Sequence, residues 1–225
     1  MSELKRLDTF AEVSSGNSAP QDKSLFANGT HAFIRTSDVG AIHVGEIAQS
    51  RDFLNGQGIK GLRLFPKGTV LFPKSGASTF LNHRVLLMQD SFVSSHLATI
   101  KADNSLCLDK YIYYFLQTVD AKSLCQDQSY PSLNRDQIAS IQVPLPSLIV
   151  QKEIVERLDG VFEEIHLLSA NQIRESICIG ELHETFISEI FNSSQAIFSE
   201  NSYATIGELC QVGDGNHSSK YPSKT

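Results

Sequence analysis

The stretch Leu62-Arg63-Leu64-Phe65-Pro66-Lys67-Gly68-Thr69-Val70-Leu71-Phe72 contains two short apolar runs separated by a Pro-Lys-Gly turn. Apolar runs bounded by turn residues are typical of strands, so we expect residues 62–65 and 69–72 to form two strands about a tight turn. Runs of similar composition predict further strands at residues 32–36, 84–88 and 96–100. Residues 1–146 are therefore predicted to form a strand-rich domain.

One helix is expected within this domain and a much longer one after it. Residues 108–119 place apolar side chains at helical spacing. The run Pro144-Leu145-Pro146 then interrupts the chain, and Ser147 is a favourable N-cap for a helix that begins at Leu148. No proline follows until beyond residue 192. The predicted fold class is α+β, a strand-rich domain followed by a long coiled-coil-like helix.

Apolar residues recur along the long helix at the spacing of a coiled-coil seam. The seam consists of two runs: Ile154, Leu158, Val161, Ile165 and Leu168, then Ile179, Leu182, Phe186 and Ile190. A helix of this length cannot bury its stripe against a small domain, so we expect it to contact another helix, from a second copy or from a partner. A helix folded back on its own domain is the alternative.

The rest of the chain is divided by composition. Residues 147–192 are assigned to the long helix and residues 193–202 to a polar linker. Residues 203–225 weakly repeat the beginning of the chain, because Gly16-Asn17 and Gly215-Asn216 align at a shift of 199 positions. This last segment is interpreted as the start of a truncated second repeat.

The distribution of charge permits nucleic-acid binding although the net charge is −6. Residues 1–140 carry 14 Lys and Arg against 13 Asp and Glu, whereas residues 141–225 carry 5 against 12. No acid lies between Asp52 and Asp90, a window with five cations: Lys60, Arg63, Lys67, Lys74 and Arg84. Binding to phosphates depends on the local field, so this window is a candidate DNA surface. A solvated face that lacks acids is the alternative.

Cysteine usage and hydropathy narrow the class of protein. The four cysteines lie far apart and form no CxxC pair, which argues against a zinc site and a disulfide framework. The polar N-terminus has no secretory signal, and no apolar stretch reaches the roughly 18 residues of a membrane span. The reduced cytoplasm is therefore the expected location, without membrane contact.

Motifs for catalysis are incomplete. Residues 56–61 fit GxGxxG, but the acid that a dinucleotide site needs is missing, so we interpret them as a glycine-rich basic loop suited to phosphate approach. His183-Glu184 is not a zinc motif, because Ile187 occupies the place of the second histidine. The chain also lacks GxSxG and the Asn/Asp-Pro-Pro-Tyr/Phe box of adenine methyltransferases. We therefore expect neither catalysis nor a cofactor or metal in this chain.

Several segments together carry a family resemblance. They are Leu7 to Gly16, Phe33-Ile34-Arg35-Thr36-Ser37-Asp38-Val39, residues 65–78, residues 129–138, Val143-Pro144-Leu145-Pro146 and Gln151-Lys152-Glu153-Ile154-Val155. In this order they resemble the specificity subunit of type I restriction–modification systems, over about residues 5 to 192. The chain departs from the family in length, because the usual member has two recognition domains and two helices.

The resemblance implies a reader of DNA and not a catalyst. Residues 1–146 would be a target recognition domain that reads half of a two-part DNA sequence. The helix would bind modification subunits, which carry S-adenosylmethionine and methylate adenine; a restriction subunit is a further candidate partner. A half-length member is expected to pair with a second copy of itself through the helix, giving a symmetric split target.

Candidate DNA contacts follow from side-chain chemistry. Phosphate contacts need positive charge or a donor, whereas base readout needs groups that pair with a base edge. The phosphate candidates are Lys60, Lys67, Lys74, Ser75 and Arg84; the base-reading candidates are Asn17, Arg35, Asn82, His83 and Gln128, with Tyr130 as a stacking residue. Structural alternatives are that Arg35 pairs with Asp38, that Lys67 is only solvated and that Asn17 shapes the turn at Ser15-Gly16.

Two rival functions remain at this point. One is a coiled-coil adaptor that binds proteins through its acidic helix and does not bind DNA. The other is an enzyme with a new kind of site in the first domain, which no motif supports.

Overall fold

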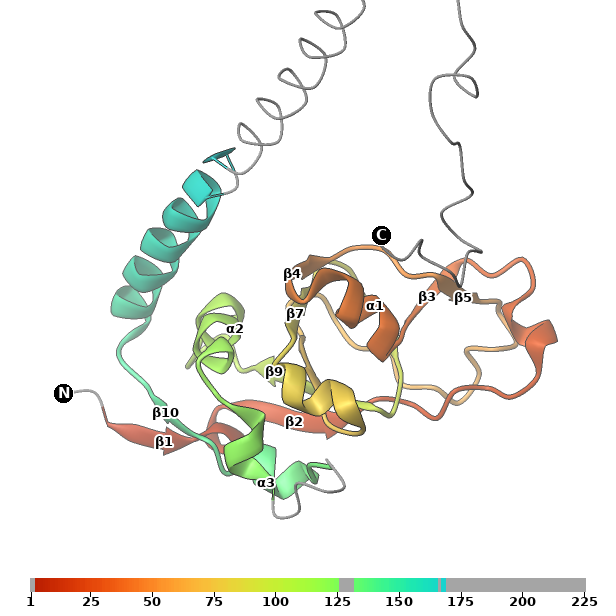
Figure 1. The fold of residues 1–225 in the computed structure, drawn as a ribbon, viewed down its shortest axis with the longest axis horizontal. Coiled ribbons are helices and arrows are strands. Elements are labelled where there is room, and N and C mark those ends of the chain that lie inside the picture. Colours follow the sequence, from red (N-terminus) through yellow and green to blue (C-terminus); the bar gives the residue numbers. More distant parts are fainter. Residues whose placement is uncertain (1–2, 126–131, 166, 169–225) are drawn as a thin grey trace, which may run out of the picture. The chain divides into compact units, whose positions relative to one another are not determined.

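The computed structural model describes residues 3–125, 132–165 and 167–168. A five-stranded sheet occupies the centre of the compact unit Met1–Phe162 (Figure 1). Its order is β2-β9-β6-β7-β4, and neighbouring strands are antiparallel except for β4 and β7. The strands are β2 (Ala11–Ser15), β4 (Val44–Ile47), β6 (Val70–Pro73), β7 (Arg84–Leu87) and β9 (Leu97–Ala102).

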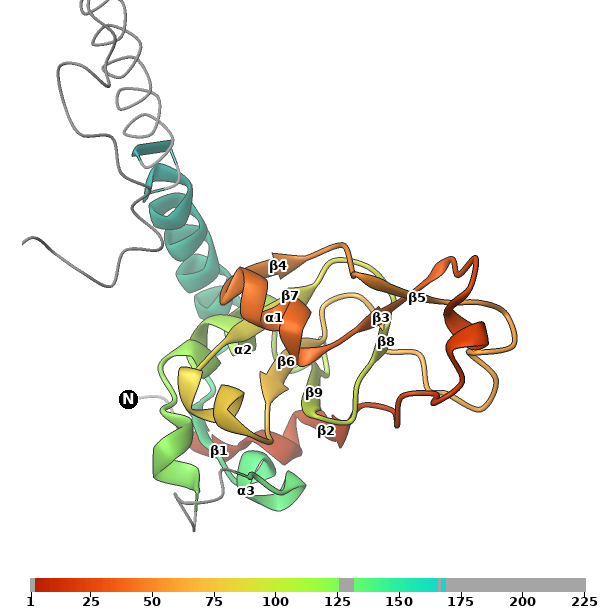
Figure 2. The same ribbon diagram turned by 45° about the vertical axis from the view of Figure 1, so that its right-hand side comes forward.

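The central strands β6 and β7 are buried on both faces, which explains why their sequences are apolar without alternation. Phe72 and Leu86 pack in the core on the α2 face, whereas Leu71 and Val85 pack in the core on the α1 face. The two helices thus cover opposite faces of the sheet (Figures 1 and 2). The α-helices are α1 (Thr36–Ile42), α2 (Asp109–Gln117) and α3 (Arg135–Ala139).

A smaller sheet with the order β5-β3-β8 has its own core of Phe33, Leu54 and Phe92. A separate pair, β1 with β10, joins the beginning of the chain to the segment that leads into the long helix. The strands are β1 (Leu4–Arg6), β3 (His31–Ile34), β5 (Asp52–Leu54), β8 (Phe92–Val93) and β10 (Gln142–Pro144). Short 3-10 helices are η1 (Leu7–Thr9), η2 (Lys23–Phe26), η3 (Ala77–Leu81) and η4 (Ala121–Leu124).

The fold confirms the α+β class, the strands at residues 84–88 and 96–100, and the helix at residues 108–119, which are β7, β9 and α2. The predicted strand at residues 32–36 is shorter, since β3 ends at Ile34. Arg35 donates its backbone N–H to the Asp38 carboxylate at 2.8 Å, which starts α1 instead.

The predicted hairpin at residues 62–72 is wrong. Both edges of β6 are occupied, by β7 and by β9, so no edge is left for residues 62–65. Of those four residues only Phe65 pairs, in an isolated bridge with Ser91. The Pro-Lys-Gly turn is present, but it leads from a loop into a central strand.

The long helix begins at residue 148, as predicted, and is described to residue 165. Its first helical hydrogen bond runs from the Gln151 N–H to the Ser147 carbonyl at 2.9 Å. The Gln151 side chain is fully buried: Oε1 accepts from the Leu108 N–H at 2.9 Å, and Nε2 donates to the Leu106 and Pro146 carbonyls at 3.0 and 2.9 Å. The first turn is therefore fixed to the loop before α2.

The next turns of this helix also pack on α2. Asp159 accepts from Lys110 Nζ at 3.0 Å and from the Tyr114 hydroxyl, and the Phe162 ring stacks on Tyr114 with centroids 5.6 Å apart. Ile154 joins the large core. For these turns the alternative of a helix folded back on its own domain is correct.

Beyond these turns the predicted seam is exposed. Val161, Ile165 and Leu168 are 52%, 49% and 62% exposed, whereas Leu158 is half-buried. Ile179, Leu182, Phe186, Ile190 and the segments 193–202 and 203–225 lie outside the described residues, so those assignments and the boundary at residue 147 stay predictions. Within the described ranges, no helix is long and apolar enough to cross a membrane.

Candidate nucleic-acid interface

The η3 edge is the edge of the large sheet at which β2 and β6 end and β4, β7 and β9 begin. The 3-10 helix η3, drawn in yellow in Figure 1, connects β6 to β7 there. Five predicted DNA contacts lie at or beside this edge: Asn17, Lys74, Ser75, Asn82 and His83. The fold thus brings Asn17 to the same edge as side chains of residues 74–83.

Lys74 and Ser75 directly follow β6. The Lys74 N–H donates to the His96 carbonyl at 3.1 Å, and Ser75 Oγ lies 2.9 Å from His96 Nδ1. Among the described residues no acid forms an ion pair with Lys74. A fixed backbone with an unneutralised amine suits a phosphate contact. His96 is not among the residues predicted from the sequence, because its place beside Lys74 and Ser75 depends on the pairing of β9 with β6.

The side chains of Asn17 and Asn82 form hydrogen bonds within the protein. Asn82 donates to Asp120 Oδ1 at 3.1 Å and accepts the Ala121 N–H at 2.9 Å, which joins η3 to η4. The Asn17 amide donates to the Arg63 carbonyl and accepts its N–H, both at 2.8 Å. The alternative for Asn17 was a structural role in the turn at Ser15-Gly16. The role of its side chain is structural, but its partner is the backbone of Arg63, which is distant in the sequence.

The structure contradicts the prediction that Arg84 contacts a phosphate, because the side chain is fully buried. Its guanidinium donates to the carbonyls of His83, Leu116 and Val119 at 2.7, 3.2 and 3.2 Å and lies 3.4 Å from the centroid of the Phe72 ring. Burial lowers the pKa of Arg84 to about 9. The group therefore remains charged at neutral pH, stabilised by backbone dipoles.

His83 stacks on His43, with ring centroids 4.5 Å apart and planes at 21°. Burial, with smaller effects of the His43 and Arg84 charges, lowers the pKa of His83 below its usual value. At neutral pH the ring is thus uncharged, and the predicted role of His83 in base reading stays a prediction.

The remaining lysines lie elsewhere. Lys67 precedes β6 at the edge opposite the η3 edge, where its N–H donates to Asp90 Oδ1 at 2.8 Å. Lys60 is exposed in the glycine-rich loop, which Asn55 organises by accepting the N–H groups of Gln57 and Gly58 at 3.0 Å each. The predicted phosphate contacts therefore do not form one patch.

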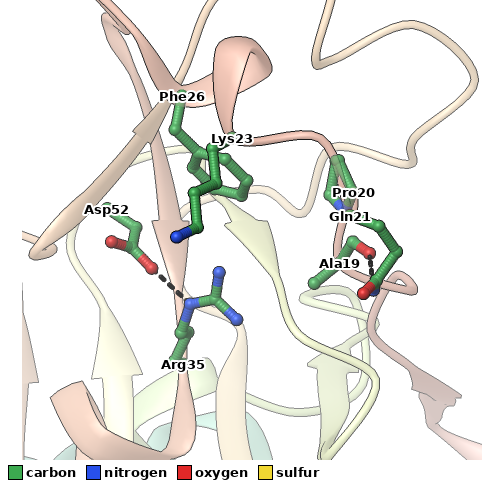
Figure 3. A pocket seen from close by; sticks show the side chains of 7 residues that line it. All are labelled: Ala19, Pro20, Gln21, Lys23, Phe26, Arg35 and Asp52. Atoms are coloured by element: carbon green, nitrogen blue, oxygen red, sulfur yellow. Dashed lines mark hydrogen bonds and ion pairs between the residues drawn. The ribbon is translucent and has the colours of Figure 1, made fainter.

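The structural alternative paired Arg35 with Asp38, but the ion pair that Arg35 forms is with Asp52. From Arg35, the Asp38 carboxylate accepts only the backbone N–H, and it also accepts the Arg51 backbone N–H at 3.3 Å. Arg35 and Asp52 line a pocket (Figure 3) that no local sequence pattern indicates, because its residues come from the loop of residues 19–21, η2, the N-cap of α1 and β5. Gln128 and Tyr130 lie outside the described residues.

Residues 2–177 match the family described as the type I restriction modification DNA specificity domain. The chain belongs to this family. No curated protein matches the sequence of this family member.

Solved structures related to the family share the fold. A chain from a structure of complex assembly and conformational transition of the type I R-M system is 17% identical, with a TM-score of 0.67 over 84% of this chain. The HsdS subunit from Thermoanaerobacter tengcongensis is 20% identical, with a TM-score of 0.58 over 76%. The type I S subunit from M. genitalium is 15% identical, with a TM-score of 0.52 over 75%. The chain spans 45%, 39% and 41% of their lengths, less than half of each.

Proposed function

We propose that this chain selects the DNA sequence at which a type I modification methyltransferase acts. The observation that carries the proposal is the match of residues 2–177 to the DNA specificity family. Lys74 and Ser75 at the η3 edge supply the phosphate contacts, and Lys60 supplies another from the glycine-rich loop. The chain itself is not the catalyst: S-adenosylmethionine binds to the partner modification subunit, which methylates adenine.

The helix of residues 148–165 is proposed to dock protein. Its first turns are held on α2, and further along the same helix the exposed Val161 and Leu168 are one heptad apart. A second copy of the chain and the modification subunits are the proposed occupants, and a restriction subunit is a further one. Two copies related by a two-fold axis would read a symmetric, two-part site.

The experiment that tests this function is a map of methylated adenines in cells that express the chain with its modification subunits. We expect one two-part motif with symmetric halves, methylated at nearly every occurrence, because two copies read the same half-site. Cells with the modification subunits alone are the control and should lack this motif. An identical methylation pattern with and without the chain would show that the chain does not select the site.

A further inference from the structure

A pocket of about 370 Å³ opens beside the small sheet. Figure 3 shows seven side chains around it: Ala19, Pro20, Gln21, Lys23, Phe26, Arg35 and Asp52. Apolar groups form part of the wall, and the charged groups are two cations and one carboxylate. The volume is at the lower end of small-molecule sites, so a single nucleobase fits within it.

Arg35 is held in this pocket by three kinds of contact. Its Nε donates to Asp52, and its guanidinium carbon lies 5.5 and 5.2 Å from the ring centroids of Phe26 and Phe33. Its backbone is fixed by the hydrogen bond to Asp38. Figure 3 shows the two terminal nitrogens turned away from Asp52, on the side of Phe26 and Ala19. The planar donor group is therefore oriented before any ligand arrives.

Two other arginines show what a purely structural role looks like. Arg63 uses both terminal nitrogens on Glu12, with Nη1 to Oε1 and Nη2 to Oε2 at 2.7 Å each. Arg84 uses all three nitrogens on backbone carbonyls. Arg35 differs, because within residues 3–125, 132–165 and 167–168 its terminal nitrogens make no hydrogen bond. A fixed guanidinium with both terminal nitrogens available is arranged for a ligand with two acceptors.

We propose that Arg35 recognises the Hoogsteen edge of a guanine, with its two terminal nitrogens donating to O6 and N7, and that Asp52 is the positioning residue. This inference rests on the proposed DNA-binding function. Guanine is the one base that presents two adjacent acceptors on that edge. A phosphate also offers two acceptors, and two cations with one carboxylate do not repel it, but the Phe26 ring favours a flat partner over a tetrahedral one.

The pocket is connected to the η3 edge through short backbone links. Ile34, the neighbour of Arg35, accepts the Ser94 N–H at 2.9 Å, and Ser94 precedes His96, whose carbonyl accepts the Lys74 N–H at 3.1 Å. A base contact at Arg35 and a phosphate contact at Lys74 can therefore belong to one bound duplex.

The test selects duplexes from a random pool with the full chain and its modification partner. We expect the unaltered chain to require guanine at one position of the half-site. Arg35→Lys and Asp52→Asn should each lose the preference at that position alone, by about 5- to 150-fold for Arg35→Lys and less for Asp52→Asn. Arg63→Lys is the matched control and should keep every preference, since its guanidinium already serves Glu12.

A second arm needs no variant and so does not depend on how Arg35→Lys folds. Replacing the selected guanine by 7-deazaguanine removes N7 and should weaken binding of the unaltered chain at that position. An abasic nucleotide opposite the guanine then distinguishes a guanine turned out of the base stack from a guanine read in the groove of the duplex. Tighter binding indicates a base turned out of the stack, and equal or weaker binding indicates readout in the groove; both agree with the proposal.

The possible failures are distinguishable. An unaltered chain that selects no sequence overturns the proposed function. An unaltered chain that selects guanine, together with a folded Arg35→Lys variant that selects it equally, overturns the role of Arg35 alone. Weakening of Arg35→Lys by the same factor on all duplexes assigns Arg35 to phosphate and also overturns the proposal.

Discussion

Arginines in this chain lie in different environments that their sequence positions do not distinguish. Arg84 lies in an acid-free window beside other cations, which suggests a phosphate contact, yet it is fully buried. The deciding groups are the Leu116 and Val119 carbonyls, 32 and 35 residues away. The apolar run Val85-Leu86-Leu87 after it was the one local hint, because a central strand buries the side chains on both of its faces.

Replacing Arg84 by Met should lower the free energy of unfolding by about 2–4 kcal/mol, because buried carbonyls lose their donor. Below the melting temperature, the DNA affinity of the folded variant should equal that of the unaltered chain. Urea titration followed by duplex binding measures both quantities. Arg51→Met is the control, since the Arg51 side chain is 72% exposed and should change stability by less than about 0.5 kcal/mol. A stable Arg84→Met protein that binds DNA poorly would place Arg84 at the interface.

Elements were predictable where local pattern and tertiary environment agree. β7, β9, α2 and the start of the long helix follow from composition, periodicity and an N-cap. The hairpin at residues 62–72 failed because strand pairing is a long-range property: β6 pairs with β9, about 27 residues further along the chain. The pairing of β1 with β10 had no local signal at all.

The start of the long helix depends on one side chain, Gln151. Replacing it by Ala removes three hydrogen bonds and leaves the Leu108 N–H and two carbonyls without these partners. We expect the free energy of unfolding to fall by about 2–4 kcal/mol. Lys152→Ala, next to it but exposed, is the control and should be nearly neutral. Equal urea midpoints for the two variants would mean that Gln151 does not hold the helix to its domain.

At the scale of the whole molecule, net charge is a poor guide to binding. The chain is acidic at −6, but its excess of acids over cations lies after residue 140. Among the described residues, the lysines without an ion pair lie in the strand-rich domain. The family could be predicted from ordered segments of sequence, whereas the grouping of side chains at the η3 edge could not. Lys67 and Lys74 are only seven positions apart in sequence, yet they lie at opposite edges of the sheet because β6 runs between them.

This separation makes the two lysines a matched pair for a binding experiment. Affinity for phosphates falls with salt, and the slope of log affinity against log salt decreases by about 0.9 for each phosphate contact that is lost. Lys74→Ala should therefore reduce the slope by about 0.9 and weaken all duplexes by the same factor. Lys67→Ala, with its backbone beside Asp90, should leave the slope unchanged.

The most direct measurement is the affinity of the purified full chain for duplex DNA over a range of salt concentrations, with and without its modification subunits. A chain that reads DNA should bind with an affinity that falls linearly on the double-logarithmic plot, and Lys74→Ala should flatten that line while Lys67→Ala does not. No salt-dependent affinity for any duplex, even with the modification subunits present, would contradict the assignment of this chain as the DNA-reading component.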